Sequence, residues 1–176
     1  MNRSLFFWTV ALLAAPLTVL AHGPSRQMVV KEVQVNAPAA KVWEVIADYC
    51  SISTWDAEVP ECQAEPGNKP DTIRTLKLKN GQQIKEKLIK HEPGNKKMQF
   101  MLLEPNEAAL PINTLGTTLS VRDGDGGTAV VEWKAAFYRS FPGPTPPPEL
   151  SDEAAVAAVT KIVDAGLAGI KSLAEK

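Results

Sequence analysis

The sequence predicts an α+β protein in which a curved antiparallel sheet of about six to seven strands wraps around a long C-terminal helix. Short alternating apolar segments, separated by turn residues, follow one another from residue 61 to residue 137, which is typical of an antiparallel meander. A proline-rich segment then precedes a stretch of helical periodicity that runs to about residue 174. Because a sheet with one apolar face needs a helix to cover it, we expect both parts to form one domain.

Residues 1–21 have the pattern of a secretory signal peptide. Arg3 and the free amine precede the apolar run LFFWTVALLAAPLTVL, and compact residues precede a cut after Ala21. The alternative is an uncleaved membrane anchor, but the run contains Pro16 and is short for a spanning helix of about 20 residues. We therefore expect residues 22–176 to form a single periplasmic domain with no membrane span after processing.

The charge balance argues against partners that bind through charge alone. The chain has 19 Lys and Arg residues against 20 Asp and Glu residues. Residues 1–21 contain one basic residue, Arg3, and no acidic one, so processing leaves 18 basic residues against 20 acidic ones and a formal net charge of −2. Nothing in this balance indicates nucleic acid or an anionic membrane as a partner.

Two cysteines, Cys50 and Cys62, lie twelve positions apart around a predicted bend. In an oxidising compartment we expect them to form a structural disulfide, which would stabilise the fold by about 2–4 kcal/mol. The alternative is a redox-active pair. That alternative lacks the CxxC spacing, and a reactive thiol also needs an environment that lowers its pKa.

The N-terminal part is predicted to be a strand followed by a short helix pair. Met28–Val35 is β-branched and partly alternating, as expected of a strand. Pro38 then opens a helix that ends at Cys50, and the bend Ser51–Trp55 follows it. The apolar residues of this helix share one face and are Val42, Val45, Ile46 and Tyr49.

Ile73–Glu92 is predicted to be a hairpin that turns at Asn80-Gly81. A two-residue loop would mix apolar and charged side chains on both faces of the hairpin. A three-residue loop, residues 79–81, places Leu76 opposite Ile84 and Arg74 opposite Glu86. We choose the second register because a buried face selects register strongly. Its apolar face holds Leu76, Leu78, Ile84 and Leu88, and its other face holds Thr75, Lys77, Lys85 and Lys87.

The remaining elements follow from the same alternation and from proline. Phe141–Glu149 contains five prolines, so it is a stiff connector rather than helix or central strand. Ser151 is the expected N-cap of the final helix. The predicted strands are Lys97–Leu103, Leu115–Val121 and Ala129–Phe137, joined by a loop at Glu104–Asn113 and a turn at Asp123–Gly127.

Two segments, VNAPAAKVWEVIADYCSISTW and LPINTLGTTLSVRDGDGGTAVVEWKAAF, resemble the polyketide cyclase-like and START-like (SRPBCC) helix-grip superfamily. A secreted chain with this cysteine pair is most similar, within that superfamily, to the MxaD-type family. The resemblance implies a periplasmic accessory protein of methanol oxidation, with methanol dehydrogenase and/or its cytochrome c acceptor as partners. It supplies no catalytic residue and no cofactor.

Inward-facing residues are expected to line a cavity, because Ala and Gly on the closing helix leave room beneath it. The alternative is a filled core. A ligand of such a cavity would be a small apolar molecule. The apolar candidates are Trp55, Leu76, Phe100, Leu115, Trp133 and Phe137, with Trp55 as the cover. Arg74 and Glu86 lie on the same inner face, where they either orient a ligand or form a structural ion pair.

Lysines on the hairpin are the candidate partner surface, since an uneven charge distribution can steer an acidic partner. These candidates are Lys77, Lys79, Lys85 and Lys87, and the alternative is a solvated strand face. A weaker hypothesis is copper chelation by His22, which becomes the amino terminus after processing, together with His91.

The sequence therefore predicts a protein that acts by binding, with no catalytic residue, metal or cofactor. The first hypothesis is the accessory role in methanol oxidation, through protein–protein contacts. The second is a carrier or sensor of a small apolar molecule, and the third is a cyclase-like enzyme.

Overall fold

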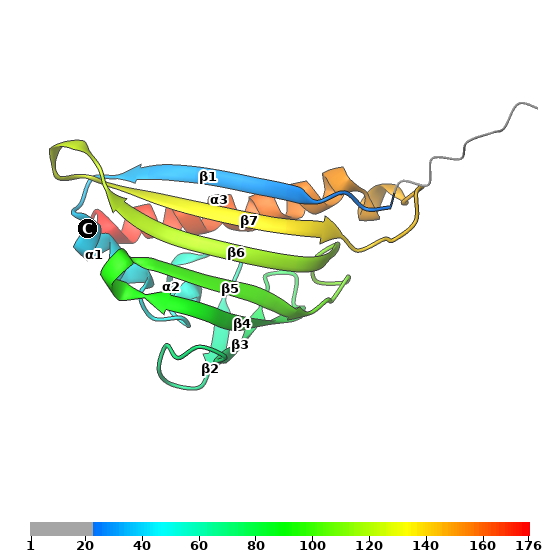
Figure 1. The fold of residues 1–176 in the computed structure, drawn as a ribbon, viewed down its shortest axis with the longest axis horizontal. Helices are drawn as coiled ribbons and strands as arrows, with labels where there is room; N and C mark the ends of the chain where they lie inside the picture. The colour runs from blue at the N-terminus through cyan, green and yellow to red at the C-terminus, as the bar shows by residue number, and fades with distance from the viewer. Residues whose placement is uncertain (1–22) are drawn as a thin grey trace, which may run out of the picture.

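A computed structural model describes residues 23–176 and confirms the predicted α+β class. Seven antiparallel strands, in the order β1-β7-β6-β5-β4-β3-β2, form one sheet that curves around the long helix α3 (Figure 1). Within this range no helix has the length and hydropathy that crossing a lipid bilayer requires. The strands are β1 Gln27–Val35, β2 Glu61–Ala64, β3 Ile73–Lys77, β4 Gln83–Glu92, β5 Lys97–Glu104, β6 Ile112–Asp123 and β7 Ala129–Arg139. The helices are α1 Ala39–Ile46, α2 Ile52–Trp55 and α3 Asp152–Ala174.

The first helix is shorter than predicted. It ends at Ile46 rather than at Cys50, because the carboxylate of Asp48 accepts the Cys50 N–H at 2.8 Å and turns the chain. The buried face also differs, since Trp43 is buried whereas Val45 is only half-buried. The bend after α1 forms a second short helix, α2, so the expected helix pair is present.

The hairpin of β3 and β4 adopts the predicted three-residue loop. Arg74 pairs with Glu86 and Leu76 pairs with Ile84. Gly81 has a φ of +83°, the left-handed conformation that this loop requires and that glycine adopts without a steric penalty. The register places the Arg74 and Glu86 side chains on the inner face of the sheet, where both are buried.

The loop before β6 is shorter than predicted. Ile112 already pairs with Arg139 of β7, so β6 begins three residues before the expected Leu115. Arg139 is largely buried and donates to Asp152 at 3.2 Å, which fixes the end of β7 against the start of α3. Ser151 caps α3 as predicted, because its side chain accepts the Ala154 N–H at 3.2 Å.

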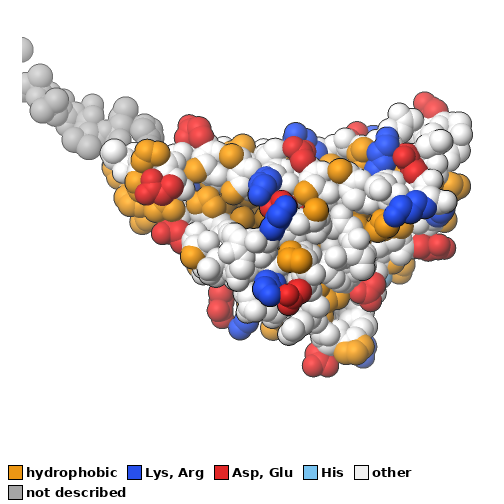
Figure 2. Space-filling model, turned by 180° about the vertical axis from the view of Figure 1, so that it is seen from behind, with side chains coloured by type: hydrophobic (Ala, Val, Ile, Leu, Met, Phe, Trp, Pro, Cys, Tyr) orange, Lys and Arg blue, Asp and Glu red, His pale blue; other side chains and the backbone are white. Residues whose placement is uncertain are grey.

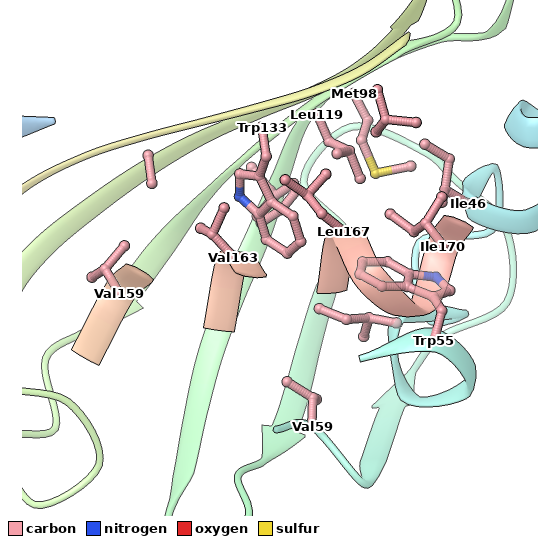
Figure 3. Packing of buried hydrophobic residues seen from close by; sticks show 14 of the residues in the cluster. Ile46, Trp55, Val59, Met98, Leu119, Trp133, Val159, Val163, Leu167 and Ile170 are labelled. Atoms are coloured by element: carbon pink, nitrogen blue, oxygen red, sulfur yellow. The ribbon is translucent and has the colours of Figure 1, made fainter. Parts of the chain in front are cut away.

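The sequence suggested that the glycines of α3 leave room for a cavity. The structure shows that they do not. They allow α3 to approach α2 and the sheet closely. An added Cβ at Gly166 would lie 2.5 Å from the Trp133 ring and 3.0 Å from Oδ2 of Asp56, and one at Gly169 would overlap the carbonyl oxygen of Trp55. Figure 3 shows the packing of Trp55 and Trp133 against α3.

Cys50 and Cys62 form the expected disulfide, with their Cα atoms 5.6 Å apart. It joins the turn after α1 to the edge strand β2. The double variant Cys50→Ser/Cys62→Ser is expected to lose about 2–4 kcal/mol of unfolding free energy, because the unfolded chain regains the freedom of the closed loop. Urea denaturation measures this loss, and wild type in reductant should match the variant. A variant as stable as the oxidised wild type would contradict the prediction.

Candidate ligand-binding site

A small cavity lies between the inner face of the sheet and α3. Its volume is about 30 Å³, which is room for about two water molecules. The wall is almost entirely apolar, and Figure 3 shows Val159 and Val163 of α3 near Trp133 of β7. The lining residues are Ile52, Val59, Arg74, Leu76, Leu78, Ile84, Glu86, Phe100, Leu110, Leu115, Thr117, Trp133, Ala135, Val159, Ile162 and Val163.

Arg74 and Glu86 are the charged residues of this wall. Nε and Nη2 of Arg74 donate to Oε2 of Glu86 at 2.8 and 2.6 Å, and Nη1 donates to the carbonyl of Tyr49. The guanidinium carbon lies 4.1 Å from the centre of the Tyr49 ring and 4.5 Å from that of Phe100, in cation–π geometry. Transferring two charges from water into an interior costs several kcal/mol per ion, so stability alone does not explain the pair.

The pair leaves hydrogen-bonding capacity beside the cavity. Both bonds from Arg74 end on the same oxygen, Oε2, and Oε1 of Glu86 accepts none from residues 23–176. Thr117, which also lines the cavity, is buried. An acceptor oxygen in an apolar wall favours a ligand that carries a neutral donor such as a hydroxyl group, and it repels a carboxylate.

The structure brings together most of the cavity residues expected from the sequence. Arg74, Glu86, Leu76, Phe100, Leu115 and Trp133 all line the cavity. Trp55 and Phe137 are buried but are not part of the lining. Trp55 packs edge-on against Trp133, with the ring centres 5.8 Å apart, and is therefore a core residue rather than a cavity cover.

Sequence reasoning missed the part of the wall that comes from α3 and from the loop before β6. Val159, Ile162 and Val163 were recognisable only as an apolar helix stripe, which does not show which residues face a cavity. Leu110 lies in a segment that the sequence predicted to be a loop, and its burial has no periodic signal.

A groove of about 360 Å³ lies outside the cavity, where α3 meets the β3–β4 loop. Leu78, Leu110 and Ile162 line both spaces, so these three side chains separate them. Glu58 joins the two sides of the groove, because its carboxylate lies 3.8 Å from Lys79 and 2.7 Å from Lys161. If the three apolar side chains move apart, cavity and groove together reach the roughly 300–1,000 Å³ typical of small-molecule sites.

Asp56 is a buried carboxyl group below α3. Its Oδ1 accepts the Glu58 N–H at 2.9 Å, whereas Oδ2 has no hydrogen-bond partner among the described residues. Burial raises the pKa of Asp56 to about 7, against the lowering effect of the Glu58 N–H. The Tyr49 hydroxyl is likewise buried without a described partner, and burial raises its pKa as well.

The titration of Asp56 predicts how stability depends on pH. The folded protein retains this proton up to about pH 7, whereas the unfolded chain releases it near pH 4. The free energy of unfolding therefore falls by about 4 kcal/mol through this group as pH rises from about 4 to about 7. Asp56→Asn lacks this titration, so its free energy of unfolding should rise relative to that of wild type by the same amount between these pH values.

Urea denaturation of wild type and Asp56→Asn at a series of pH values measures this difference. Asp164→Asn is a matched control on α3, since the Asp164 side chain is 53% exposed. Parallel stability curves for wild type and Asp56→Asn would show that Asp56 does not titrate near neutral pH.

The four candidate lysines do not form one free basic surface. Lys77, Lys85 and Lys87 lie on the outer face of β3 and β4, whereas Lys79 lies in the loop beside the groove. Of the four, only Lys85 has no ion-pair partner in the part of the chain that the structure describes. The observed pairs are Lys77–Glu61 at 2.6 Å, Lys79–Glu58 at 3.8 Å and Lys87–Asp71 at 3.2 Å.

His91 contacts the segment of α1 and thereby has a structural role. Its Nε2 lies 2.8 Å from the carbonyl oxygen of Ala47, and its ring packs against Trp43 with the centres 5.5 Å apart. His22, the other residue of the copper hypothesis, lies outside the described residues, as does the predicted signal peptide. Residues 23–176 contain no cluster of three His, Cys, Asp or Glu side chains that could hold a metal ion.

A family model described as polyketide cyclase/dehydrase and lipid transport matches residues 26–175. The chain belongs to this family. Membership confirms the helix-grip superfamily that the sequence resembles, and the curved sheet around α3 is its fold. Membership of this family does not show the narrower MxaD-type assignment. A comparison with curated proteins finds no match.

Solved structures share this fold at low sequence identity. Protein XoxI from Bacillus cereus is 20% identical over 83% of this chain and 94% of its own, with a TM-score of 0.69. The Zhui aromatase/cyclase from a Streptomyces species is 16% identical over 86% of this chain and 94% of its own, with a TM-score of 0.67. A protein from Nitrosospira multiformis is 18% identical over 83% of this chain and 94% of its own, with a TM-score of 0.66. These likenesses concern the fold alone.

Proposed function

We propose that this helix-grip protein binds a small apolar molecule with a hydroxyl group between the sheet and α3. The observation that carries the proposal is the Arg74–Glu86 pair, which is 2% and 4% exposed in an otherwise apolar cavity wall. Oε1 of Glu86 is available to accept the ligand's O–H, and the Leu, Val and Trp side chains take up its apolar part. Lipid transport, in the description of the family, supports an apolar ligand.

The ligand enters through the groove between α3 and the β3–β4 loop. The cavity of about 30 Å³ is closed by Leu78, Leu110 and Ile162, so binding requires these side chains to move. The carboxylate of Glu58, which bridges Lys79 and Lys161 across this groove, is the contact that holds the closed form. The two lysine side chains are 67% exposed, whereas that of Glu58 is 15% exposed. Ion pairs that reach solvent contribute about 1 kcal/mol or less, so these two contacts do not lock the closed form.

We propose binding without catalysis. General acid–base chemistry needs a group within hydrogen-bond reach of the substrate whose pKa lies near the working pH. The two ionisable groups of the cavity wall, Arg74 and Glu86, are bonded to each other. This arrangement supports recognition of a polar group more than proton transfer.

Native mass spectrometry of the processed protein, purified from its own cells, tests the proposal. We expect a bound compound that organic solvent releases and that carries a hydroxyl group and no carboxylate. Leu110→Trp should abolish this binding, because the larger side chain fills the passage between groove and cavity. Leu103→Trp, at an exposed position on the sheet, is the matched control. Protein without a bound compound, or equal binding by both variants, would contradict the proposal.

A second candidate function is the accessory role in methanol oxidation that the MxaD-type resemblance implies. The Cys50–Cys62 disulfide supports an oxidising compartment such as the periplasm. Lys85, exposed and without an ion-pair partner in the described range, favours contact with an acidic protein. Purified methanol dehydrogenase and cytochrome c should then bind the processed protein, and Lys85→Glu should weaken that binding. Absence of binding to either protein would exclude this role.

A further inference from the structure

The outer face of the sheet is turned away from α3 and toward the viewer in Figure 1, whereas Figure 2 shows the molecule from behind. It carries the most exposed large hydrophobic side chains of residues 23–176. Side chains alternate between the two faces of a strand, and most inward residues of strands β3 to β7 are buried. Within residues 23–176, every large hydrophobic side chain that is exposed belongs to the outward set. These residues are Met28, Val30, Ile73, Ile89, Met101, Leu103 and Tyr138.

The strand register aligns part of this surface into a row. Met28 pairs with Ala136, Ala136 with Gly116, and Gly116 with Met101. Neighbouring strands are about 4.8 Å apart, so the two methionines stand about 14 Å from each other across four strands. The small residues between them, Gly116 and Ala136, leave a hollow of about 530 Å³ on the sheet.

The composition of the hollow is that of a protein-binding surface. Arg26, Met28, Met101 and Tyr138 contribute to its lining, and the lining contains no acidic residue. Aromatic residues, methionine and arginine are enriched in the cores of protein interfaces, whereas Asp and Glu are depleted there. Methionine also adapts its shape to different neighbours, because its side chain is unbranched and flexible.

The charges at the hollow indicate an acidic partner. Arg26 and Lys134 line it, and Arg26 has no ion pair within the described range. Lys134 lies 2.8 Å from Glu132, so Arg26 carries the uncompensated charge.

We propose that this hollow is the docking surface for an acidic protein partner. An apolar side chain of the partner lies over Gly116 and Ala136 between the two methionines, and its carboxylates reach Arg26 and Lys134. A second copy of this chain fits less well, since a two-fold axis would place the same basic residues against each other.

The proposal goes beyond small-molecule binding, because the outward residues Met28, Met101 and Gly116 line the hollow but not the cavity. Phe100 and Thr117, which lie in the sheet between the two spaces, contribute to both linings.

Site-specific photo-crosslinking in the cells that produce the protein tests the proposal. The full-length protein carries p-benzoylphenylalanine at Thr118, which lines the hollow, or at Glu153 on α3 as a control position. We expect a covalent adduct with another, acidic protein from position 118 alone. The captured protein is then purified, and its affinity for the processed wild-type protein is measured at several salt concentrations.

Two variants decide whether the hollow makes the contact. Arg26→Glu/Lys134→Glu should weaken binding at least tenfold and flatten its salt dependence, because the charge attraction is lost. Gly116→Leu should weaken binding to a similar extent with an unchanged melting temperature, since an added Cβ there meets no atom within 4 Å. The matched control Lys41→Glu/Lys69→Glu reverses two exposed charges elsewhere and should bind as wild type does.

The other outcomes overturn the proposal. A self-adduct from position 118 would assign the hollow to a second copy of the chain. Sedimentation of the processed protein with phosphatidylglycerol vesicles, lost in Arg26→Glu/Lys134→Glu, would assign it to a membrane surface. Absence of any adduct, or unchanged affinity in both hollow variants, would show that the hollow is not a docking surface.

Discussion

Arg74→Met is expected to lower the free energy of unfolding by about 3–5 kcal/mol. The substitution leaves Glu86, whose side chain is 4% exposed, without its counterion in an apolar wall. It also removes the hydrogen bond to the Tyr49 carbonyl and the cation–π contacts with Tyr49 and Phe100. Urea denaturation at pH 7 measures the loss.

Two further variants separate the buried charge from other effects. Arg122→Met removes one partner of an exposed pair, Arg122–Glu32 at 3.0 Å, and should cost less than about 1 kcal/mol. Arg74→Met/Glu86→Leu removes both buried charges and should recover most of the stability. A loss in Arg74→Met no larger than that in Arg122→Met would contradict the buried pair.

Gly169→Ala is expected to destabilise the protein by about 3 kcal/mol, the upper end of the usual range for overpacking. In an open helix the same substitution would stabilise by about 1 kcal/mol, since alanine has the higher helix propensity. At this position the added Cβ would overlap the carbonyl oxygen of Trp55, so α3 must move away from α2.

Ala168→Gly, at the neighbouring exposed position of α3, is the matched control for this effect. It should cost about 1 kcal/mol through helix propensity alone. Thermal and urea denaturation of both variants give the comparison. Gly169→Ala with wild-type or higher stability would show that α3 and α2 are not in close contact.

The register of β3 and β4 could be predicted because one face of the hairpin is buried. A slip by one residue would have moved the apolar side chains to solvent, and only the three-residue loop avoided this. The same argument placed Arg74 opposite Glu86. The polar end of the site thus follows from alternation and from the turn chemistry at Asn80-Gly81.

The extent of the cavity could not be predicted, because alternation shows which face a residue occupies and not where α3 crosses that face. Phe137 and Leu115 both point inward, yet only Leu115 reaches the cavity. Leu110 reaches it from a loop, without any periodic signal. The position of α3 depends on packing between distant segments, which one sequence does not reveal.

The glycines of α3 illustrate a second limit. A missing side chain either leaves space or permits a close approach, and the sequence is the same in both cases. We expected space, whereas Gly166 and Gly169 allow contact with Trp133, Asp56 and Trp55. The burial of Asp56 depends on this contact, so its raised pKa had no signal in the sequence either.

Methyl NMR of the processed, delipidated protein during titration with decanol and with decanoate tests most directly whether the cavity binds hydroxyl-bearing apolar molecules. Decanol should shift the methyl signals of Leu76, Leu115 and Val163, which line the cavity. It should leave Val30 on the outer face unchanged, and decanoate should bind at least tenfold more weakly because of Glu86. Unshifted cavity methyls, or equal affinity for decanol and decanoate, would contradict the account.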